Sequence, residues 1–488
     1  MFALILTTLS SHIGAFCFLY MVTPYSWILG GVFEVFALFA LFLKPYNKLK
    51  KKTVVRLKGM QWSREDFCRG WLITGDTGSG KTRSGITPLL FQVFTNEPDW
   101  GGVCIDDKGV YWETLCAMAK HFGREDDLIL LQVQPDDADS RWQPNQTYNL
   151  TSDLGIPFNT YAKFVVDTAG SLGSKGDKGF FKNQAQTHIA VALELLYEIS
   201  VDVSLENAYN ILINKNDLEE ALNDLSELHQ TDRRRDILNH FKERYLKQPP
   251  EQIGGVRETI ANYLQYFLTP EIAQIFCSEK NTFDFSDIDR GKIICVAMPQ
   301  KFQTERRYVN TFLKMLFYTH VLRRFDKDKE ERKSDNLLVL WADEAQRFMT
   351  ASEEGMSDYN SVDVIREAGA TVVAATQSTT SFVPPLGKEK ARVLALNLRN
   401  RLIFKAADEE GAIDSADFIG KRKVLKRSWG FSGGKRSRNY SHVEEYQLKP
   451  YELRKFPKHT CILAHCEKGH KKVLLPPIEP DGEVCEWF

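Results

Sequence analysis

Trp71-Leu72-Ile73-Thr74-Gly75-Asp76-Thr77-Gly78-Ser79-Gly80-Lys81-Thr82 is the stretch of sequence that decides the fold. Its first four residues predict a short buried strand, and the rest matches the phosphate-loop pattern G-x-x-x-x-G-K-[ST] without a mismatch. In such a loop, backbone N–H groups surround the phosphates, the lysine neutralises their oxygens and the hydroxyl binds Mg²⁺. We therefore predict an ATP and Mg²⁺ site at Gly75, Asp76, Thr77, Gly78, Ser79, Gly80, Lys81 and Thr82, with Lys81 also catalytic.

The segment after the loop predicts the helix whose N-terminus faces the phosphates. It spans residues 83–93, and Pro88 lies within it. Because proline removes a backbone donor and clashes with the preceding turn, we expect a kink at this position. The competing interpretation is a chance match in a glycine-rich turn, which the strand before the loop and the helix after it disfavour.

A second buried strand is predicted to supply the acids that a nucleotide hydrolase needs. Leu337-Leu338-Val339-Leu340-Trp341 is a continuous apolar run, typical of a strand buried on both faces, and Ala342-Asp343-Glu344 ends it. We predict that Asp343 holds Mg²⁺ through water and that Glu344 polarises the attacking water. The alternative is an exposed acidic pair that merely ends a strand.

Further strands complete a predicted mostly parallel sheet. Ala370–Thr376 ends at Gln377, whose amide we predict to sense the γ-phosphate or the attacking water. Because helical patterns separate several of the strands, the fold class is α/β, a RecA-like P-loop NTPase. The other predicted strands are Gly102–Asp106, Leu128–Gln132, Lys292–Met298, Arg401–Lys405 and Cys461–His465.

Charge is distributed unevenly along the chain. The 488 residues carry a net charge of −1, and 43% of them are hydrophobic, which excludes a disordered tail protein and a basic nucleic-acid coat. Two apolar runs, 2–22 and 27–43, would span about 31 and 25 Å as helices, near the thickness of a bilayer core. Seven basic residues follow within 44–58, so we predict a transmembrane helical hairpin with both ends in the cytoplasm. The alternative is a cleaved signal peptide, for which a basic start and a cleavage site are missing.

The long distance between the loop and the acidic strand indicates an insertion. Residues from about 180 to 280 show only helical apolar spacing, which predicts an all-α domain. Nine cysteines without a paired framework favour a reducing compartment. The predicted units are a membrane anchor (1–43), a basic linker (44–60), a first core part (61–180), the all-α domain (181–280) and a second core part with a C-terminal extension (281–488).

Several motifs resemble the type IV coupling proteins, the membrane ATPases of conjugation and type IV secretion in the FtsK/HerA branch of P-loop motors. The similarity covers nearly the whole chain and includes the membrane anchor, the phosphate loop and the helical insertion. The shorter matching motifs are Val103-Cys104-Ile105-Asp106-Asp107-Lys108-Gly109, Thr282-Phe283-Asp284-Phe285-Ser286-Asp287-Ile288, Gly291-Lys292-Ile293 and Leu448-Lys449-Pro450-Tyr451-Glu452-Leu453.

The resemblance implies a function, an assembly and two further catalytic residues. It implies a hexameric ring at the bacterial inner membrane, multi-pass and with its body in the cytoplasm. It also implies a ring that couples ATP hydrolysis to transfer of single-stranded DNA with its relaxase through a type IV secretion channel. In such rings an arginine reaches the neighbouring subunit's nucleotide, and Arg366 and Arg69 are the candidates. The plainer interpretation of each is a surface salt bridge. Two other functions remain open: an ATP-dependent scaffold that recruits protein effectors, and a double-stranded DNA pump of the chromosome-segregation type.

Two C-terminal stretches carry weaker signals. Lys421–Arg438 holds eight basic residues and no acid, with Trp429 and Phe431 among them, which predicts a mobile loop that contacts single-stranded nucleic acid or is simply solvated. His459, Cys461, His465, Cys466 and His470 suggest a metal site, but their spacing fits no zinc pattern. A β-hairpin explains this second stretch without a metal.

Overall fold

The computed structural model describes residues 52–139, 141–172, 179–352, 355–432 and 435–478. Apart from Lys52, they belong to one compact unit, Thr53–Phe488. The predicted transmembrane hairpin over 1–43 lies outside the described residues. Within the described ranges, no helix is both long and apolar enough to cross a bilayer.

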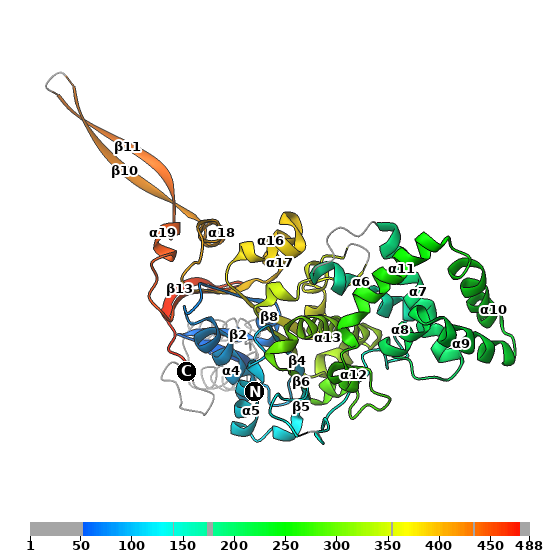
Figure 1. Cartoon of the computed structure of the whole chain (residues 1–488). Helices are drawn as coiled ribbons and strands as arrows, with labels where there is room; N and C mark the ends of the chain where they lie inside the picture. Colours follow the sequence, from blue (N-terminus) through cyan, green and yellow to red (C-terminus); the bar gives the residue numbers. More distant parts are fainter. Residues whose placement is uncertain (1–51, 140, 173–178, 353–354, 433–434, 479–488) are drawn as a thin grey trace, which may run out of the picture. The chain divides into compact units, whose positions relative to one another are not determined.

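A nine-stranded sheet forms the centre of this unit, in the order β13-β12-β9-β3-β8-β7-β4-β6-β5 (Figure 1). The seven strands from β9 to β5 run parallel, whereas β12 and β13 are antiparallel additions at one edge. The prediction of an α/β fold with a mostly parallel sheet is therefore confirmed. The strands are β1 (Thr53–Leu57), β2 (Met60–Ser63), β3 (Trp71–Thr74), β4 (Gly101–Asp106), β5 (Leu128–Gln132), β6 (Ile293–Ala297), β7 (Leu338–Asp343), β8 (Ala370–Thr376), β9 (Asn400–Ile403), β10 (Lys421–Ser432), β11 (Lys435–Tyr446), β12 (Thr460–His465) and β13 (Gly469–Leu474).

Helices cover both faces of the parallel strands, which is why these strands are apolar without alternation. Leu338 and Leu340 of β7 belong to the core that α13 closes, whereas Val339 and Trp341 belong to the core under α4 and α5. The helices around the sheet are α3 (Arg64–Phe67), α4 (Thr87–Asn96), α5 (Tyr111–His121), α13 (Gln303–Arg323), α14 (Lys329–Ser334), α15 (Asp358–Ser361), α16 (Val383–Leu386), α17 (Lys388–Asn397), α18 (Glu409–Ile419) and α19 (Pro450–Leu453). The short 3₁₀ turns are η2 (Glu125–Asp127), η4 (Gln265–Phe267), η5 (Phe285–Arg290), η6 (Gln300–Phe302), η7 (Arg324–Asp326), η8 (Ala345–Arg347), η9 (Ile365–Ala368) and η10 (Thr379–Phe382).

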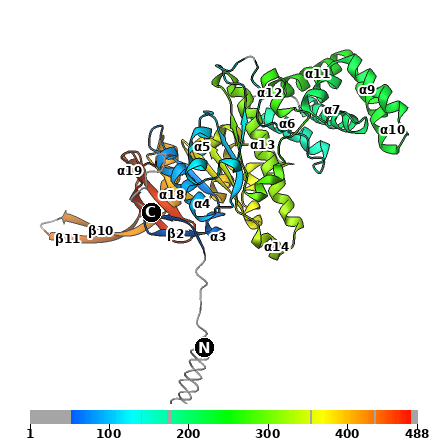
Figure 2. The same cartoon turned by 90° about the horizontal axis from the view of Figure 1, so that it is seen from below.

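A helical segment interrupts the sheet between β5 and β6 (Figures 1 and 2). Among its described residues, 158–276 contain helices and no strand. Its inner helix α6 packs against α13, so its core is continuous with one face of the sheet. The helices are α6 (Phe158–Leu172), α7 (Gly179–Glu198), α8 (Leu205–Ile213), α9 (Lys215–Glu227), α10 (Asp232–Asn239), the π-helix η3 (His240–Tyr245), α11 (Pro250–Leu264) and α12 (Pro270–Phe276).

The helix after the phosphate loop differs from the expected one. It begins as a π-helix, η1 (Lys81–Ile86), and continues as α4, in which Pro88 occupies the first turn. A proline is tolerated there because the N–H groups of a first turn have no partner within the α-helix. The proline therefore lies at a change of helix type rather than inside one regular helix.

The basic stretch at 421–438 is a hairpin, so the prediction of a mobile loop was wrong. β10 and β11 pair from Lys421↔Tyr446 to Ser432↔Lys435 without interruption and form a separate two-stranded sheet. In the sequence, Gly433-Gly434 separates the strands, and Gly-Gly is a favoured two-residue hairpin connection. The charges of the stretch concealed its strand pattern. The β-hairpin predicted for the other C-terminal stretch is confirmed as β12–β13.

Candidate active site

The phosphate loop lies at the carboxyl edge of the parallel sheet, between β3 and η1. Its start is fixed by two neighbouring strand ends: the Gly75 N–H donates to the Gln377 carbonyl at 3.1 Å, and the Asp76 N–H donates to the Lys405 carbonyl at 2.7 Å. Lys81 Nζ donates to the Gly75 carbonyl at 2.7 Å, so the ammonium group lies across the mouth of the loop. The loop backbone is thereby held from three sides.

Two glycines of the motif are required by the geometry. Gly80 has φ +108°, a region that favours glycine, and a Cβ there would lie 2.7 Å from His459 Nδ1. A Cβ on Gly75 would lie 2.7 Å from both Phe404 Cβ and Ser79 Oγ. The loop is therefore too tightly packed for side chains at these positions.

Thr82 and Asp343 come together from segments far apart in the sequence. Thr82 Oγ1 donates to Asp343 Oδ2 at 3.0 Å, although 261 positions separate the two residues. Asp343 ends β7 and Thr82 lies in the first turn after the loop, so the sheet order alone brings them to one edge. A hydroxyl and a carboxylate side by side are hard oxygen donors of the kind that Mg²⁺ binds.

Burial controls the charges at this edge. It raises the pKa of Asp343, the nearby Glu344 carboxylate raises it further, and the Thr82 hydrogen bond opposes both effects. Burial lowers the pKa of Lys81, while the charges of Glu344 and Asp343 counteract this. Adding a cation would offset the cost of keeping the Asp343 carboxylate ionised.

Glu344 has a backbone conformation that is rare for its residue type. It lies in the left-handed region at φ 51° and ψ 45°, directly after β7. Its N–H donates to Asp343 Oδ1 at 2.9 Å, and Gln346 Nε2 donates to Glu344 Oε2 at 2.8 Å. Such strain is retained where surrounding contacts impose it, and it is concentrated at functional sites.

Gln377 directly follows β8, which lies between β3, the strand before the phosphate loop, and β7, the strand that ends at Asp343. β8 pairs with β3 on one side and with β7 on the other. Gln377 is exposed, and its carbonyl accepts from Gly75. The amide therefore emerges at the edge that holds Lys81 and Asp343.

Arg69 and Arg366 lie at the opposite edge of the sheet. They precede β3 and β8, and seven residues of parallel strand span about 20 Å. Arg69 forms ion pairs with Glu65 and Glu467, and Arg366 contacts Glu367 at 3.9 Å. The structure thus separates both arginines from the phosphate loop of their own chain. Both line one pocket whose basic side chains are Arg64, Arg69, Lys329, Arg332, Lys333 and Arg366.

Two residues at the phosphate-loop edge of the sheet were not among the site residues predicted from the sequence. His459 has φ +66°, its N–H donates to the Ser79 carbonyl at 2.9 Å, and its Nδ1 lies 2.8 Å from Ser84 Oγ. Asp106, at the end of β4, pairs in register with Asp343. Burial raises the pKa of Asp106, and hydrogen bonds from the N–H groups of Val110 and Tyr111 oppose this. Asp106 could have been recognised from its place after a buried strand, whereas His459 carries no local signal.

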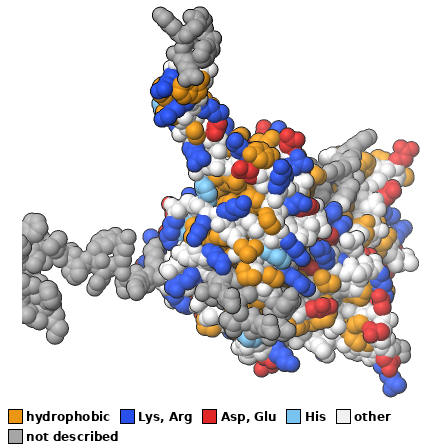
Figure 3. All heavy atoms as spheres, turned by 90° about the vertical axis from the view of Figure 1, so that its left-hand side faces the viewer, with side chains coloured by type: hydrophobic (Ala, Val, Ile, Leu, Met, Phe, Trp, Pro, Cys, Tyr) orange, Lys and Arg blue, Asp and Glu red, His pale blue; other side chains and the backbone are white. Residues whose placement is uncertain are grey.

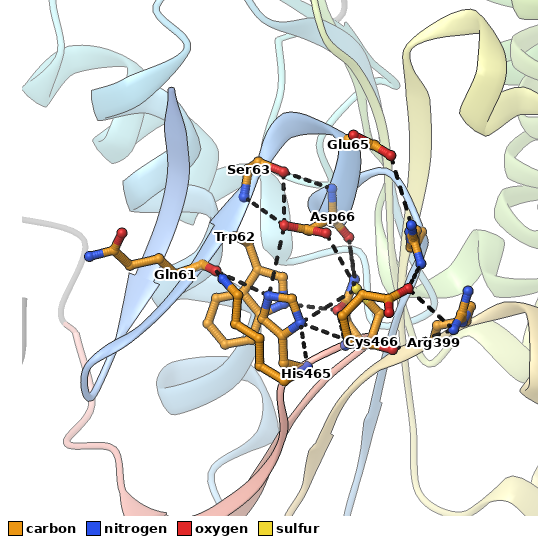
Figure 4. Close-up of polar contacts among 12 residues, drawn as sticks. Gln61, Trp62, Ser63, Glu65, Asp66, Arg399, His465 and Cys466 are labelled. Carbon is orange, nitrogen blue, oxygen red and sulfur yellow. Dashed lines mark hydrogen bonds and ion pairs between the residues drawn. The ribbon is translucent and has the colours of Figure 1, made fainter. Parts of the chain in front are cut away.

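Of the suspected metal residues, His465 and Cys466 lie together in the structure, and they form a cluster with Asp66, which was not among those suspected (Figure 4). His465 stacks on Trp62, with ring centroids 4.8 Å apart. Its Nδ1 accepts from the Glu467 N–H at 3.0 Å, and its Nε2 lies 3.0 Å from the Gln61 carbonyl. Both ring nitrogens therefore have protein partners, and the cluster fastens β2 and α3 to the β12–β13 hairpin.

The residues at the phosphate loop fit a Mg²⁺-nucleotide. Ser79 Oγ is buried and has no hydrogen-bond partner among the described residues. This hydroxyl, the Lys81 ammonium and the hydroxyl–carboxylate pair of Thr82 and Asp343 together match phosphate oxygens and a divalent cation.

Comparison with known proteins agrees with this geometry. The model of the type IV secretion-system coupling protein DNA-binding domain matches residues 59–468. No curated protein gives a significant sequence match. The bacterial conjugative coupling protein TrwBdeltaN70, in its unbound form, superimposes with a TM-score of 0.63 at 17% identity, over 90% of this chain and 91% of the other.

Two further solved structures resemble the chain to the same degree. TrwB in complex with ADP and Mg²⁺ gives a TM-score of 0.63 at 16% identity, over 90% of this chain and 92% of that one. TrwB with a non-hydrolysable ATP analogue gives 0.62 at 17%, with the same coverage. These likenesses establish a shared fold, and the family match over 59–468 goes further: this chain belongs to the family of type IV secretion-system coupling proteins.

Proposed function

We propose that this chain hydrolyses ATP with Mg²⁺ at its phosphate loop and couples hydrolysis to DNA transfer through a type IV secretion channel. The observation that carries the proposal is the Thr82–Asp343 hydrogen bond of 3.0 Å, formed beside Lys81 and Glu344 in a chain of the coupling-protein family. The named relative TrwB binds ADP with Mg²⁺ and an ATP analogue, which supports the choice of nucleotide.

Each residue at the edge has a distinct role in this proposal. Residues 75–80 cradle the phosphates, Lys81 neutralises them, and Thr82 with Asp343 holds the cation. Bound Mg²⁺ supplies charge stabilisation at the phosphate oxygens. Glu344 orients the attacking water and accepts its proton, and Gln377 contacts the same water or the γ-phosphate.

The assembly is also part of the proposal. The arginine-lined pocket lies at the sheet edge remote from the loop, so Arg366 and Arg69 suit action on a neighbouring subunit's nucleotide in a homo-oligomeric ring, which we expect to be a hexamer. Residues 1–43 anchor this ring in the bacterial inner membrane with the body in the cytoplasm. The cargo is single-stranded DNA with its relaxase.

The decisive experiment measures ATP hydrolysis by the full-length chain with and without single- and double-stranded DNA. We expect Lys81→Ala to abolish turnover, whereas Lys215→Ala, a change at an exposed lysine on α9, leaves it intact. We expect single strands to stimulate wild-type turnover. Hydrolysis without a DNA response would favour the effector-recruiting scaffold, and a strong preference for duplex would favour the chromosome-type pump.

A further inference from the structure

The β10–β11 hairpin has two chemically different faces. Residues opposite each other in an antiparallel pair share a face, so the register assigns every position. One face, here called the ladder face, holds the pairs Lys421↔Tyr446, Lys423↔Glu444, Leu425↔His442, Arg427↔Tyr440 and Trp429↔Arg438. Every aromatic side chain described in the hairpin lies on it.

On the ladder face, three cationic side chains each contact the aromatic ring of the residue paired with them on the other strand. Lys421 Nζ lies 4.7 Å from the Tyr446 ring centroid, and the Arg427 guanidinium lies 5.6 Å from that of Tyr440. The Arg438 guanidinium lies 4.5 Å from the Trp429 ring. The other face carries Arg422, the Lys426–Glu445 ion pair and otherwise mainly small or aliphatic residues, and none of its described side chains is aromatic.

The outer rungs of the ladder face are open to solvent. Trp429 is 61% exposed and Tyr440 is 53% exposed, although each ring already contacts an arginine. In Figure 3, Lys, Arg and hydrophobic side chains are mixed on the coloured part of the upward projection. Only the root is covered, because Tyr446 packs against the small core formed by α18 and α19.

The strand pairing of the hairpin does not account for this exposure. β10 and β11 pair with no other described strand, and an isolated two-stranded hairpin is marginally stable in water. Lysines along its edges would deter pairing with other chains. Exposed aromatic rings on one face would instead favour contacts with other molecules. A ligand therefore explains these rings better than protection of the strand edges does.

We propose that the ladder face binds single-stranded nucleic acid, with bases stacked on Trp429 and Tyr440 and phosphates held by Lys423, Arg427 and Arg438. This inference rests on the proposed function and names the surface that takes the DNA. Same-face positions repeat about every 6.8 Å along an antiparallel strand, so the five pairs of the ladder face distribute rings and cations over about 27 Å. Aromatic platforms between cations accept any base.

A single strand fits this face better than duplex DNA or a bilayer does. In a duplex the base faces are stacked on each other and unavailable to the rings. A bilayer would favour aromatic residues gathered at one depth, whereas the described rings occur both at the root, with Tyr446, and in the outer part of the hairpin, with Tyr440 and Trp429. Their distribution along the strands therefore matches a linear polymer.

Fluorescence anisotropy of a labelled oligo(dT), titrated with the full-length chain, tests the inference. We expect Trp429→Leu with Tyr440→Leu to weaken binding about tenfold or more while leaving the salt dependence unchanged. Lys423→Ser with Arg427→Ser is expected to lower the slope of log affinity against log salt by about 0.7 per lost contact. The matched control, Ser428→Ala with Ser441→Ala, changes the opposite face and is expected to bind like wild type.

The outcomes separate this inference from the proposed function. If wild type binds oligo(dT) and hydrolyses ATP but the leucine variant binds equally well, the hairpin inference is overturned and the proposed function stands. If wild type hydrolyses ATP and never binds the oligonucleotide, both the DNA part of the function and the inference fail. Phosphatidylglycerol vesicles provide the last comparison: loss of vesicle binding alone in the leucine variant would overturn the inference in favour of a membrane contact. Equal basal ATP hydrolysis in all variants shows that they are folded.

Discussion

At the scale of single residues, the site depends on backbone conformations that are costly. Glu344 and His459 are both non-glycine residues with left-handed backbone, and both lie against the phosphate loop or the acid strand. Such a conformation costs about 1–2 kcal/mol per residue. The neighbouring structure must impose it, and in return a carboxylate and an imidazole are directed into the nucleotide-binding edge.

Because the backbone at Glu344 is strained, we expect two substitutions there to lower activity alike but to differ in their effect on stability. Glu344→Gln and Glu344→Gly both remove the carboxylate, so we expect both to lower kcat by at least about a hundredfold while nucleotide binding persists. Only glycine relieves the left-handed backbone, so we expect the glycine variant to be about 1 kcal/mol more stable than the glutamine variant. Thermal melting and a steady-state ATPase assay measure the two effects. Equal stability of the variants would show that the backbone is not strained.

His459 predicts a coupling between the C-terminal hairpin and the phosphate loop. Its Nδ1 lies 2.8 Å from Ser84 Oγ, in the first turn after the loop. We expect His459→Ala and Ser84→Ala each to weaken nucleotide binding several-fold, and the double variant to be no weaker than the worse single one. Such a double-mutant cycle gives a coupling of about 1 kcal/mol for one hydrogen bond. Additive losses, measured by titration with a fluorescent nucleotide, would mean that the contact is not used.

At the scale of elements, the buried strands could be predicted from the sequence and the exposed strands of the β10–β11 hairpin could not. β7 and β8 are apolar on both faces, so their sequences predicted strands, and the polar residues at their ends, Asp343 and Gln377, lie at the edge of the sheet that carries the phosphate loop. β10 and β11 escaped because their exposed faces are rich in charge, and their regularity appears only when cross-strand partners are known. His459 escaped because its partner Ser84 is 375 positions away, so the contact exists only after β12 joins the sheet.

The helical segment contains a buried histidine pair that makes its stability depend on pH. His188 Nδ1 lies 2.9 Å from His240 Nε2, and both side chains are buried between α7 and η3. Burial, with a contribution from the neighbouring His240, lowers the pKa of His188 to about 3. Burial, with a contribution from Arg244, lowers the pKa of His240 to about 4. In the folded segment both rings are therefore neutral at pH 5.

This pair predicts loss of local stability on acidification. The unfolded histidines gain protons below about pH 6.5 and the folded ones do not, so stability is intact above that pH and falls toward pH 4. At pH 5 we expect the penalty to reach about 2–4 kcal/mol for the pair, since one pKa unit corresponds to 1.36 kcal/mol. Hydrogen exchange of α7 peptides in wild type and in His188→Leu with His240→Leu, compared at each pH, measures it. A constant difference between the two proteins from pH 7 to pH 5 would contradict this assignment.

At the scale of the whole molecule, the parallel sheet separates two sets of charged groups. Lys81 and Thr82 follow the loop at the carboxyl end of β3 and Asp343 ends β7, whereas Arg69 and Arg366 precede β3 and β8. A rigid sheet does not bring its opposite edges together, so one chain cannot place these arginines on its own nucleotide. In a head-to-tail ring the arginine edge of one subunit faces a different edge of the next, as a heterologous interface requires.

The proposed ring makes a prediction that a single chain cannot satisfy. We expect Arg366→Ala and Lys81→Ala each to abolish hydrolysis, because one lacks the arginine for its neighbour and the other lacks a working phosphate loop. In an equal mixture, an intact loop meets an intact arginine at about a quarter of the interfaces of randomly assembled rings. Hydrolysis is therefore expected to return to about a quarter of the wild-type rate. Mixing Arg366→Ala with Arg69→Ala,Arg366→Ala is the control, since no interface then regains Arg366. If the first mixture stayed as inactive as its components, in rings shown to exchange subunits, Arg366 would act within its own chain or only in folding.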